Sequence, residues 1–113
     1  MYESSPVNNI SRQARCFTGY NPDRELSSAD VGLLVDVDVP WIPRYTTPGS
    51  STFWAQIDVD VLKTASPMWS FPSNLRLQGN SARILEMLLA RLEAMATPQF
   101  RDEAAARRKR LET

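Results

Sequence analysis

The segment that most constrains this chain runs from Val31 to Pro43 and reads V-G-L-L-V-D-V-D-V-P-W-I-P. Its first part is almost continuously apolar and rich in branched side chains, which is typical of a strand buried on both faces of a parallel sheet. Two aspartates and a Pro-Trp-Ile-Pro segment then end the run. Because a parallel sheet collects its ligands beyond the carboxyl ends of its strands, we expect any site to lie where this run stops.

Length and charge limit the classes of protein to which the chain can belong. With 113 residues it is long enough for one small domain at most. It has 13 lysines and arginines and 13 aspartates and glutamates, so its formal net charge is zero. A neutral chain has no long-range field that attracts nucleic acid or an anionic membrane, and we expect neither partner.

The scarcity of histidine and cysteine narrows the chemistry further. Histidine is absent, which excludes Ser-His and Cys-His nucleophile pairs and removes the commonest metal ligand. Cys16 is the single cysteine, so no intrachain disulfide forms and a reducing compartment is favoured. Together with the lack of a long apolar run or signal core, this predicts a soluble, intracellular and most simply cytoplasmic protein.

Periodicity and turn residues predict the remaining elements. In chain order they are a short helical or turn segment at Leu26–Asp30, the strand from Val31 to about Asp38, a strand at Thr52–Asp58, one helical turn within 59–65, a short strand at Asn74–Gln78, a helix at Ser81–Ala96 and a second helix from Pro98. Asn80 or Ser81 is expected to cap the first long helix, and Thr97-Pro98 to end it.

This order of strands and connections predicts an α/β fold, a partial Rossmann-like, doubly wound parallel sheet of about three strands with C-terminal helices. A complete doubly wound sheet has five or six strands. Three parallel strands leave an apolar edge unpaired, which invites aggregation or a partner. We therefore interpret the chain as part of a domain.

Several groups of residues follow one another in the order of a known family. They are Gly19-Tyr20-Asn21-Pro22, Ala29-Asp30, D-V-D-V-P-W-I-P at 36–43, Gln56-Ile57-Asp58-Val59-Asp60 and Met68-Trp69-Ser70-Phe71-Pro72. In this the chain resembles the central domain of thiamine-diphosphate-dependent enzymes of the acetolactate-synthase-like group, specifically the second half of that domain. The resemblance covers about residues 17–113. Residues 1–16 are polar without a sustained period and are expected to be a poorly ordered lead-in. The resemblance makes 17–97 a partial central domain, and 98–113 is expected to be a charged C-terminal helix.

The resemblance implies a three-domain parent enzyme, a 2-oxo acid decarboxylase or carboligase, whose chemistry lies between the two outer domains. The first outer domain supplies an activating glutamate, and the last holds diphosphate and magnesium through a Gly-Asp-Gly motif. The four glycines of this chain form no such motif. Thiamine diphosphate and magnesium are therefore cofactors of the family, and we expect this chain alone to bind neither and to hold no catalytic residue.

Some members of the family also bind FAD along the central domain. Where these members have a Gly-x-Arg stretch, this chain has Asp36-Val37-Asp38-Val39-Pro40-Trp41, and it has Gly79-Asn80 where an acidic residue is common. The sequence therefore disfavours a flavin site.

Two sets of residues are candidates for a cofactor site. The aspartates at the strand ends, Asp36, Asp38, Asp58 and Asp60, are suited as oxygen ligands to a hard cation, or else they cap turns and accept backbone N–H groups. Alternate residues of a strand face opposite sides, so we favour the second reading and expect no metal.

The aromatic set is Trp41, Trp54, Trp69, Phe53 and Phe71. These rings either stack on a flat ligand or pack in a core, and we favour packing.

Two further features have ordinary explanations. The basic run at 107–110 resembles a nuclear address or a phosphate patch, but its place in the last turn of a helix is explained by the helix dipole. Cys16 has no histidine to activate it, so we expect a spectator thiol.

Two functions remain open. In the first, the chain is a fragment of the central structural domain and is inactive alone, with a role in spacing the catalytic domains and in subunit packing. In the second, it is a stand-alone interaction module that docks on a larger homologue. Accordingly, the expected partner is a second copy or a larger homologous subunit.

Overall fold

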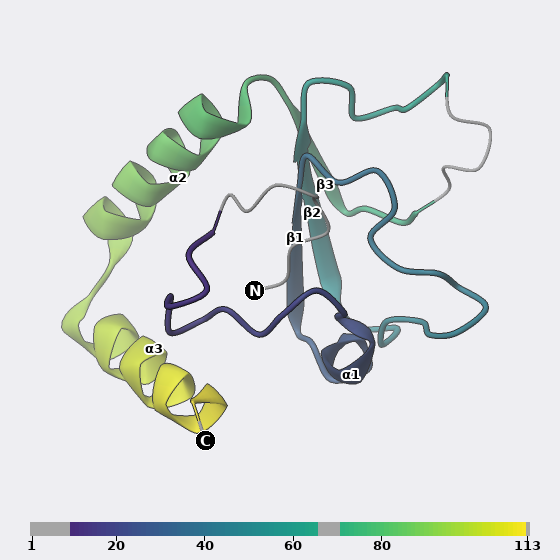
Figure 1. The fold of residues 1–113 in the computed structure, drawn as a ribbon. Helices are drawn as coiled ribbons and strands as arrows, with labels where there is room; N and C mark the ends of the chain where they lie inside the picture. Colours follow the sequence, from purple (N-terminus) through teal and green to yellow (C-terminus); the bar gives the residue numbers. More distant parts are fainter. Residues whose placement is uncertain (1–9, 66–70, 113) are drawn as a thin grey trace. The chain divides into compact units, whose positions relative to one another are not determined.

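The computed structural model describes residues 10–65 and 71–112 of the chain (Figure 1). It divides the chain into two compact units, one of Pro22–Glu86 and one of Met1–Asn21 with Met87–Thr113. Part of the lead-in predicted at 1–16 lies outside the described residues. Trp69 lies outside them as well. Within residues 10–16, backbone hydrogen bonds form turns, for example from Ala14 N to the carbonyl oxygen of Ser11. The predicted division into 1–16, 17–97 and 98–113 stays a prediction.

The first unit contains the sheet. Strands β1 (Val31–Val35), β2 (Phe53–Asp58) and β3 (Leu75–Gln78) are all parallel and lie in the order β1-β2-β3. The pairing sets Leu33 beside Ala55 and Ala55 beside Leu75, so these three side chains share one face. The predicted α/β class, with three parallel strands and C-terminal helices, is therefore confirmed.

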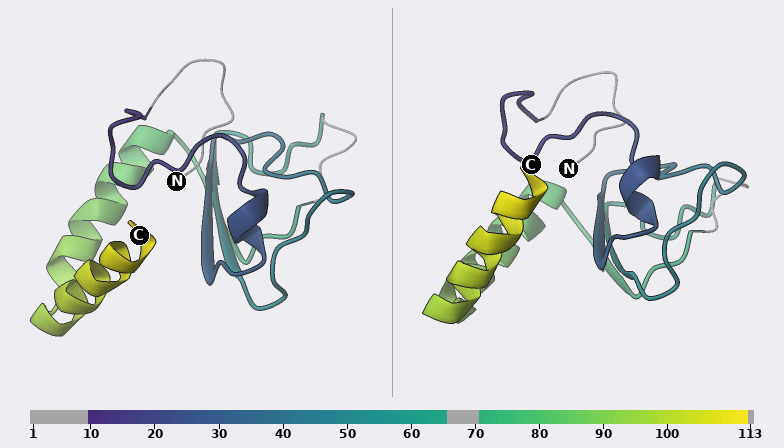
Figure 2. Two further views of the ribbon diagram at one scale, coloured as in Figure 1. Left: turned by 60° about the horizontal axis from the view of Figure 1, so that its bottom comes forward. Right: turned by 90° about the horizontal axis from the view of Figure 1, so that it is seen from below.

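A compact core lies on the other face of the sheet. Its buried members come from a short helix, from strands β1 and β2 and from the connecting loops: Leu26, Leu34, Trp41, Trp54 and Phe71. Helix α1 (Asp23–Leu26) and the loops that follow β1 and β2 lie on one side of the sheet (Figure 2). Leu26 is the buried residue of that helix, and Trp41 reaches the core from the Pro-Trp-Ile-Pro segment. The core is therefore built by loops, where a doubly wound sheet uses helices.

The expectation that the first strand is buried on both faces is wrong. Leu34 is buried, but its neighbours on the opposite face, Val31 and Leu33, are 61% and 44% exposed. Phe53, Leu75 and Leu77 are also exposed on that face. Side chains alternate between the faces of a strand, and the loops with the core tryptophans lie on the Leu34 face. On the opposite face Ile57 of β2 is fully buried, but the side chains of β1 are not. An apolar run therefore identified the strand correctly but did not reveal which face is covered.

The strand boundaries differ slightly from those predicted, and one predicted element is absent. Strand β1 ends at Val35, three residues earlier than expected, because Asp36 has a left-handed backbone with a φ of 50°. The segment 59–65 contains turns and bends and no helical turn. There the backbone N–H groups of Asp60 and Lys63 donate to aspartate side chains, which compete with helical hydrogen bonds.

Both C-terminal helices form where the sequence predicts them. Helix α2 spans Ser81–Met95 and helix α3 spans Pro98–Leu111. Asn80 Oδ1 accepts the backbone N–H of Arg83 at the start of α2, and Thr97 Oγ1 accepts that of Phe100 at the start of α3. Pro98 lies in the first turn of α3, where the N–H group that proline lacks would have no partner within the helix. The predicted apolar stripe of α2 is present in the sequence, and its leucines are partly or largely exposed.

The side chain of Gln56 gives the first testable prediction. Gln56 is 1% exposed on the central strand, and within residues 10–65 and 71–112 neither its Nε2 nor its Oε1 atom has a hydrogen-bond partner. Since a buried amide without partners has a desolvation penalty, replacing Gln56 by methionine is expected to raise the free energy of unfolding by about 1–2 kcal/mol. Chemical denaturation measures this, with the exposed Gln78→Met as the control that leaves stability unchanged. A destabilised Gln56→Met variant would show that the amide is satisfied in solution.

Candidate functional site

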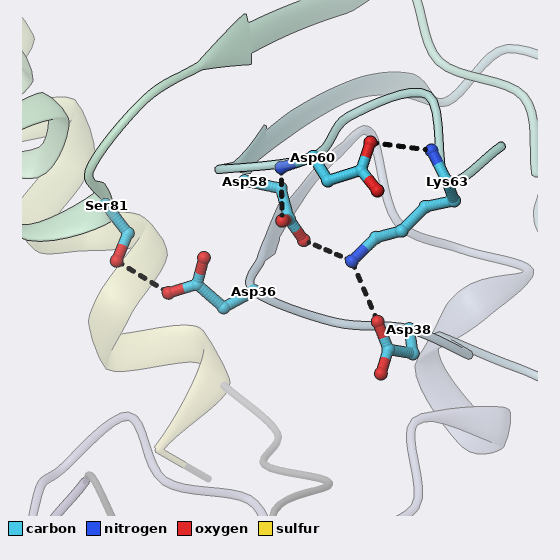
Figure 3. Close-up of polar contacts among 6 residues, drawn as sticks. All are labelled: Asp36, Asp38, Asp58, Asp60, Lys63 and Ser81. Carbon is cyan, nitrogen blue, oxygen red and sulfur yellow. Dashed lines mark hydrogen bonds and ion pairs between the residues drawn. The ribbon is translucent and has the colours of Figure 1, made fainter. Parts of the chain in front are cut away.

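The four aspartates considered as cofactor ligands lie at the carboxyl edge of the sheet, in the unit that contains the sheet (Figure 3). Asp36 and Asp38 follow β1, Asp58 is the last residue of β2, and Asp60 follows it. Parallel strands end at the same edge, which explains why residues far apart in the sequence meet there.

A lysine that the sequence analysis did not single out joins two of these aspartates. Lys63 Nζ lies 2.8 Å from Asp58 Oδ2 and 2.8 Å from Asp38 Oδ1 (Figure 3). The Asp58 side chain is 4% exposed and that of Lys63 is 13% exposed, whereas Asp38 is 83% exposed. The ammonium group therefore forms one buried ion pair with the end of β2 and one exposed ion pair with the loop after β1.

The other aspartate contacts organise the turns around this lysine. Asp58 Oδ1 accepts the backbone N–H of Asp60 at 2.9 Å, and Asp60 Oδ1 accepts the backbone N–H of Lys63 at 3.1 Å. Lys63 has a left-handed backbone with a φ of 49°, which completes the turn. These contacts confirm the reading in which Asp58 and Asp60 accept backbone N–H groups. In the sequence, the one sign of this contact is that Lys63 follows the strand-end Asp58 by five positions.

Asp36 points to a different partner. Its Oδ2 atom accepts a hydrogen bond of 2.6 Å from the hydroxyl of Ser81, the first residue of α2 (Figure 3). Asp36 and Asp38 are two residues apart, yet one contacts the start of a helix and the other contacts Lys63. The aspartates therefore do not converge on one centre.

This arrangement has a consequence for cation binding. In residues 10–65 and 71–112, no group of three or more Cys, Asp or Glu side chains is arranged to hold a metal ion. Asp38 and Asp58 instead both form an ion pair with the ammonium group of Lys63. Two of the four carboxylates at this edge are therefore already engaged in ion pairs with Lys63.

The ion pairs shift the pKa values of both buried partners. Burial alone would raise the pKa of Asp58, but the hydrogen bond and charge of Lys63 and the backbone N–H of Asp60 outweigh it and hold the pKa below 3.8. Burial alone would lower the pKa of Lys63, but Asp38 and Asp58 outweigh it and raise the pKa above 10.5. Both groups are therefore charged over the whole neutral range.

These shifts predict how stability depends on pH. The contribution of Asp58 is complete above its ordinary pKa and is lost as the pH falls through the lowered pKa of the folded state. That of Lys63 is complete below its ordinary pKa and is lost as the pH rises through the raised one. We expect a stability plateau from about pH 5 to 10, measured by denaturation at a series of pH values. Asp58→Asn should flatten the acid limb, and an unchanged limb in this variant would contradict the assignment.

The aromatic candidates divide between packing and exposure. Trp41 and Trp54 are 5% and 7% exposed and their ring centroids lie 4.8 Å apart. Phe71 meets Trp41 edge to face at 5.0 Å. For these three rings the prediction of packing is confirmed, and Trp41 is a core residue. For Phe53 it is wrong, because this ring lies on the exposed face of the sheet.

Cys16 and the basic run at 107–110 belong to the other compact unit. Cys16 is exposed and forms no disulfide. The basic run occupies the last turn of α3, with Arg108, Lys109 and Arg110 near the negative end of the helix dipole. Among the described residues, no helix combines the length and hydrophobicity needed to cross a membrane.

Comparison of the chain with protein-family models, with curated proteins and with solved structures found no match in any of the three.

Proposed function

We propose that this chain is a structural segment, the second half of a central domain of the acetolactate-synthase-like kind, and that it has no catalytic activity alone. The parent enzyme would be a thiamine-diphosphate-dependent carboligase or decarboxylase. The role of the segment in it would be to space the catalytic domains and to help subunits pack. Thiamine diphosphate and magnesium belong to the parent enzyme in this proposal, and FAD is not part of it.

The observation that carries the proposal is the position of Lys63. Ligands of a parallel sheet bind beyond the carboxyl ends of its strands, and here Lys63 occupies that position between Asp38 and Asp58. At neutral pH both members of the buried Asp58–Lys63 pair are charged and bonded to each other. The edge therefore supports a structural role, which agrees with the resemblance of D-V-P-W-I-P and W-S-F-P to the family.

The first test is a calorimetric titration of the purified chain with thiamine diphosphate and magnesium. We expect no heat of binding and no turnover of a 2-oxo acid, while an intact acetolactate synthase measured in parallel shows both. A micromolar binding signal, or turnover by the chain alone, would overturn the proposal.

The second test supplies the missing part of the domain. The first half of an acetolactate-synthase central domain is expressed separately and mixed with the chain. We expect a one-to-one complex in light scattering after size exclusion, because the sheet then gains the strands that it lacks. If no complex forms with the half-domain, the proposal fails.

The exposed apolar face of the sheet favours a second candidate, a stand-alone interaction module. Val31, Leu33 and Phe53 are each more than two fifths exposed and lie on the same face. A contiguous apolar face of this kind marks protein interaction sites. This candidate predicts a cooperatively unfolding monomer that binds a complete homologous subunit. The structural segment instead binds only the half-domain, so mixing the chain with the half-domain and, separately, with a complete subunit distinguishes the two.

A further inference from the structure

We draw no further inference here: the strongest candidate, the apolar pocket that Leu92, Met95 and Phe100 line where helix α2 passes into helix α3, is an exposed apolar surface, and nothing in the structure shows what covers it.

Discussion

Replacing Lys63 by methionine is expected to lower the free energy of unfolding by about 3 kcal/mol, because it leaves the Asp58 carboxylate buried without its counter-ion. The Asp58 side chain is 4% exposed, so water cannot take the place of the ammonium group without a structural change. Methionine keeps the length of the lysine stem and removes its charge, which isolates the electrostatic effect. Urea denaturation at pH 7 measures the loss.

Two further variants at the same edge serve as controls. Asp38→Asn removes the exposed partner of Lys63 and should cost less than about 1 kcal/mol, because an exposed ion pair adds little. Combining Asp58→Asn with Lys63→Met removes both buried charges and should recover part of the loss. If Lys63→Met were as mild as Asp38→Asn, the buried ion pair would have no role in holding the edge together.

Replacing Gly32 by alanine is expected to destabilise the chain by about 3 kcal/mol, because the added methyl group overlaps the ring of Trp54. Gly32 pairs directly with Trp54 across the two strands, and this ring fills the space that a Cβ atom would occupy. The ring is held between Gly32 and the core partner Trp41, so it has little freedom to move away. Thermal or chemical denaturation measures the effect.

A double variant shows whether steric overlap is the cause. In Gly32→Ala with Trp54→Leu, the smaller side chain leaves room for the methyl group, so the two losses should be less than additive by about 1–2 kcal/mol. Val31→Ala, at an exposed position of the same strand, should cost less than about 1 kcal/mol. Additive losses in the double variant would mean that the alanine acts through the backbone of β1 and not through the ring.

The sequence alone determined the class of the fold and the positions of most elements. The apolar run from Val31, the aromatic and branched run that ends at Asp58, and the stripe of leucines after Ser81 are each found in the element predicted for them. Helix ends were predictable because capping is local: Thr97 and Pro98 lie within one turn of the N–H groups that they affect. Patterns of this range depend on neighbours in the chain and so are visible in the sequence.

Only the tertiary structure decided which groups meet at the carboxyl edge and which face of the sheet is covered. Lys63 contacts Asp38 across 25 positions of sequence, and nothing in the spacing of the two residues predicts that contact. Likewise, Val31 and Leu34 belong to one apolar run, yet the loop with Trp41 buries only the second of them. The physical reason is the same in both cases. Strand pairing and loop packing bring distant segments together, and the burial of a side chain depends on those segments rather than on its own neighbours in the chain.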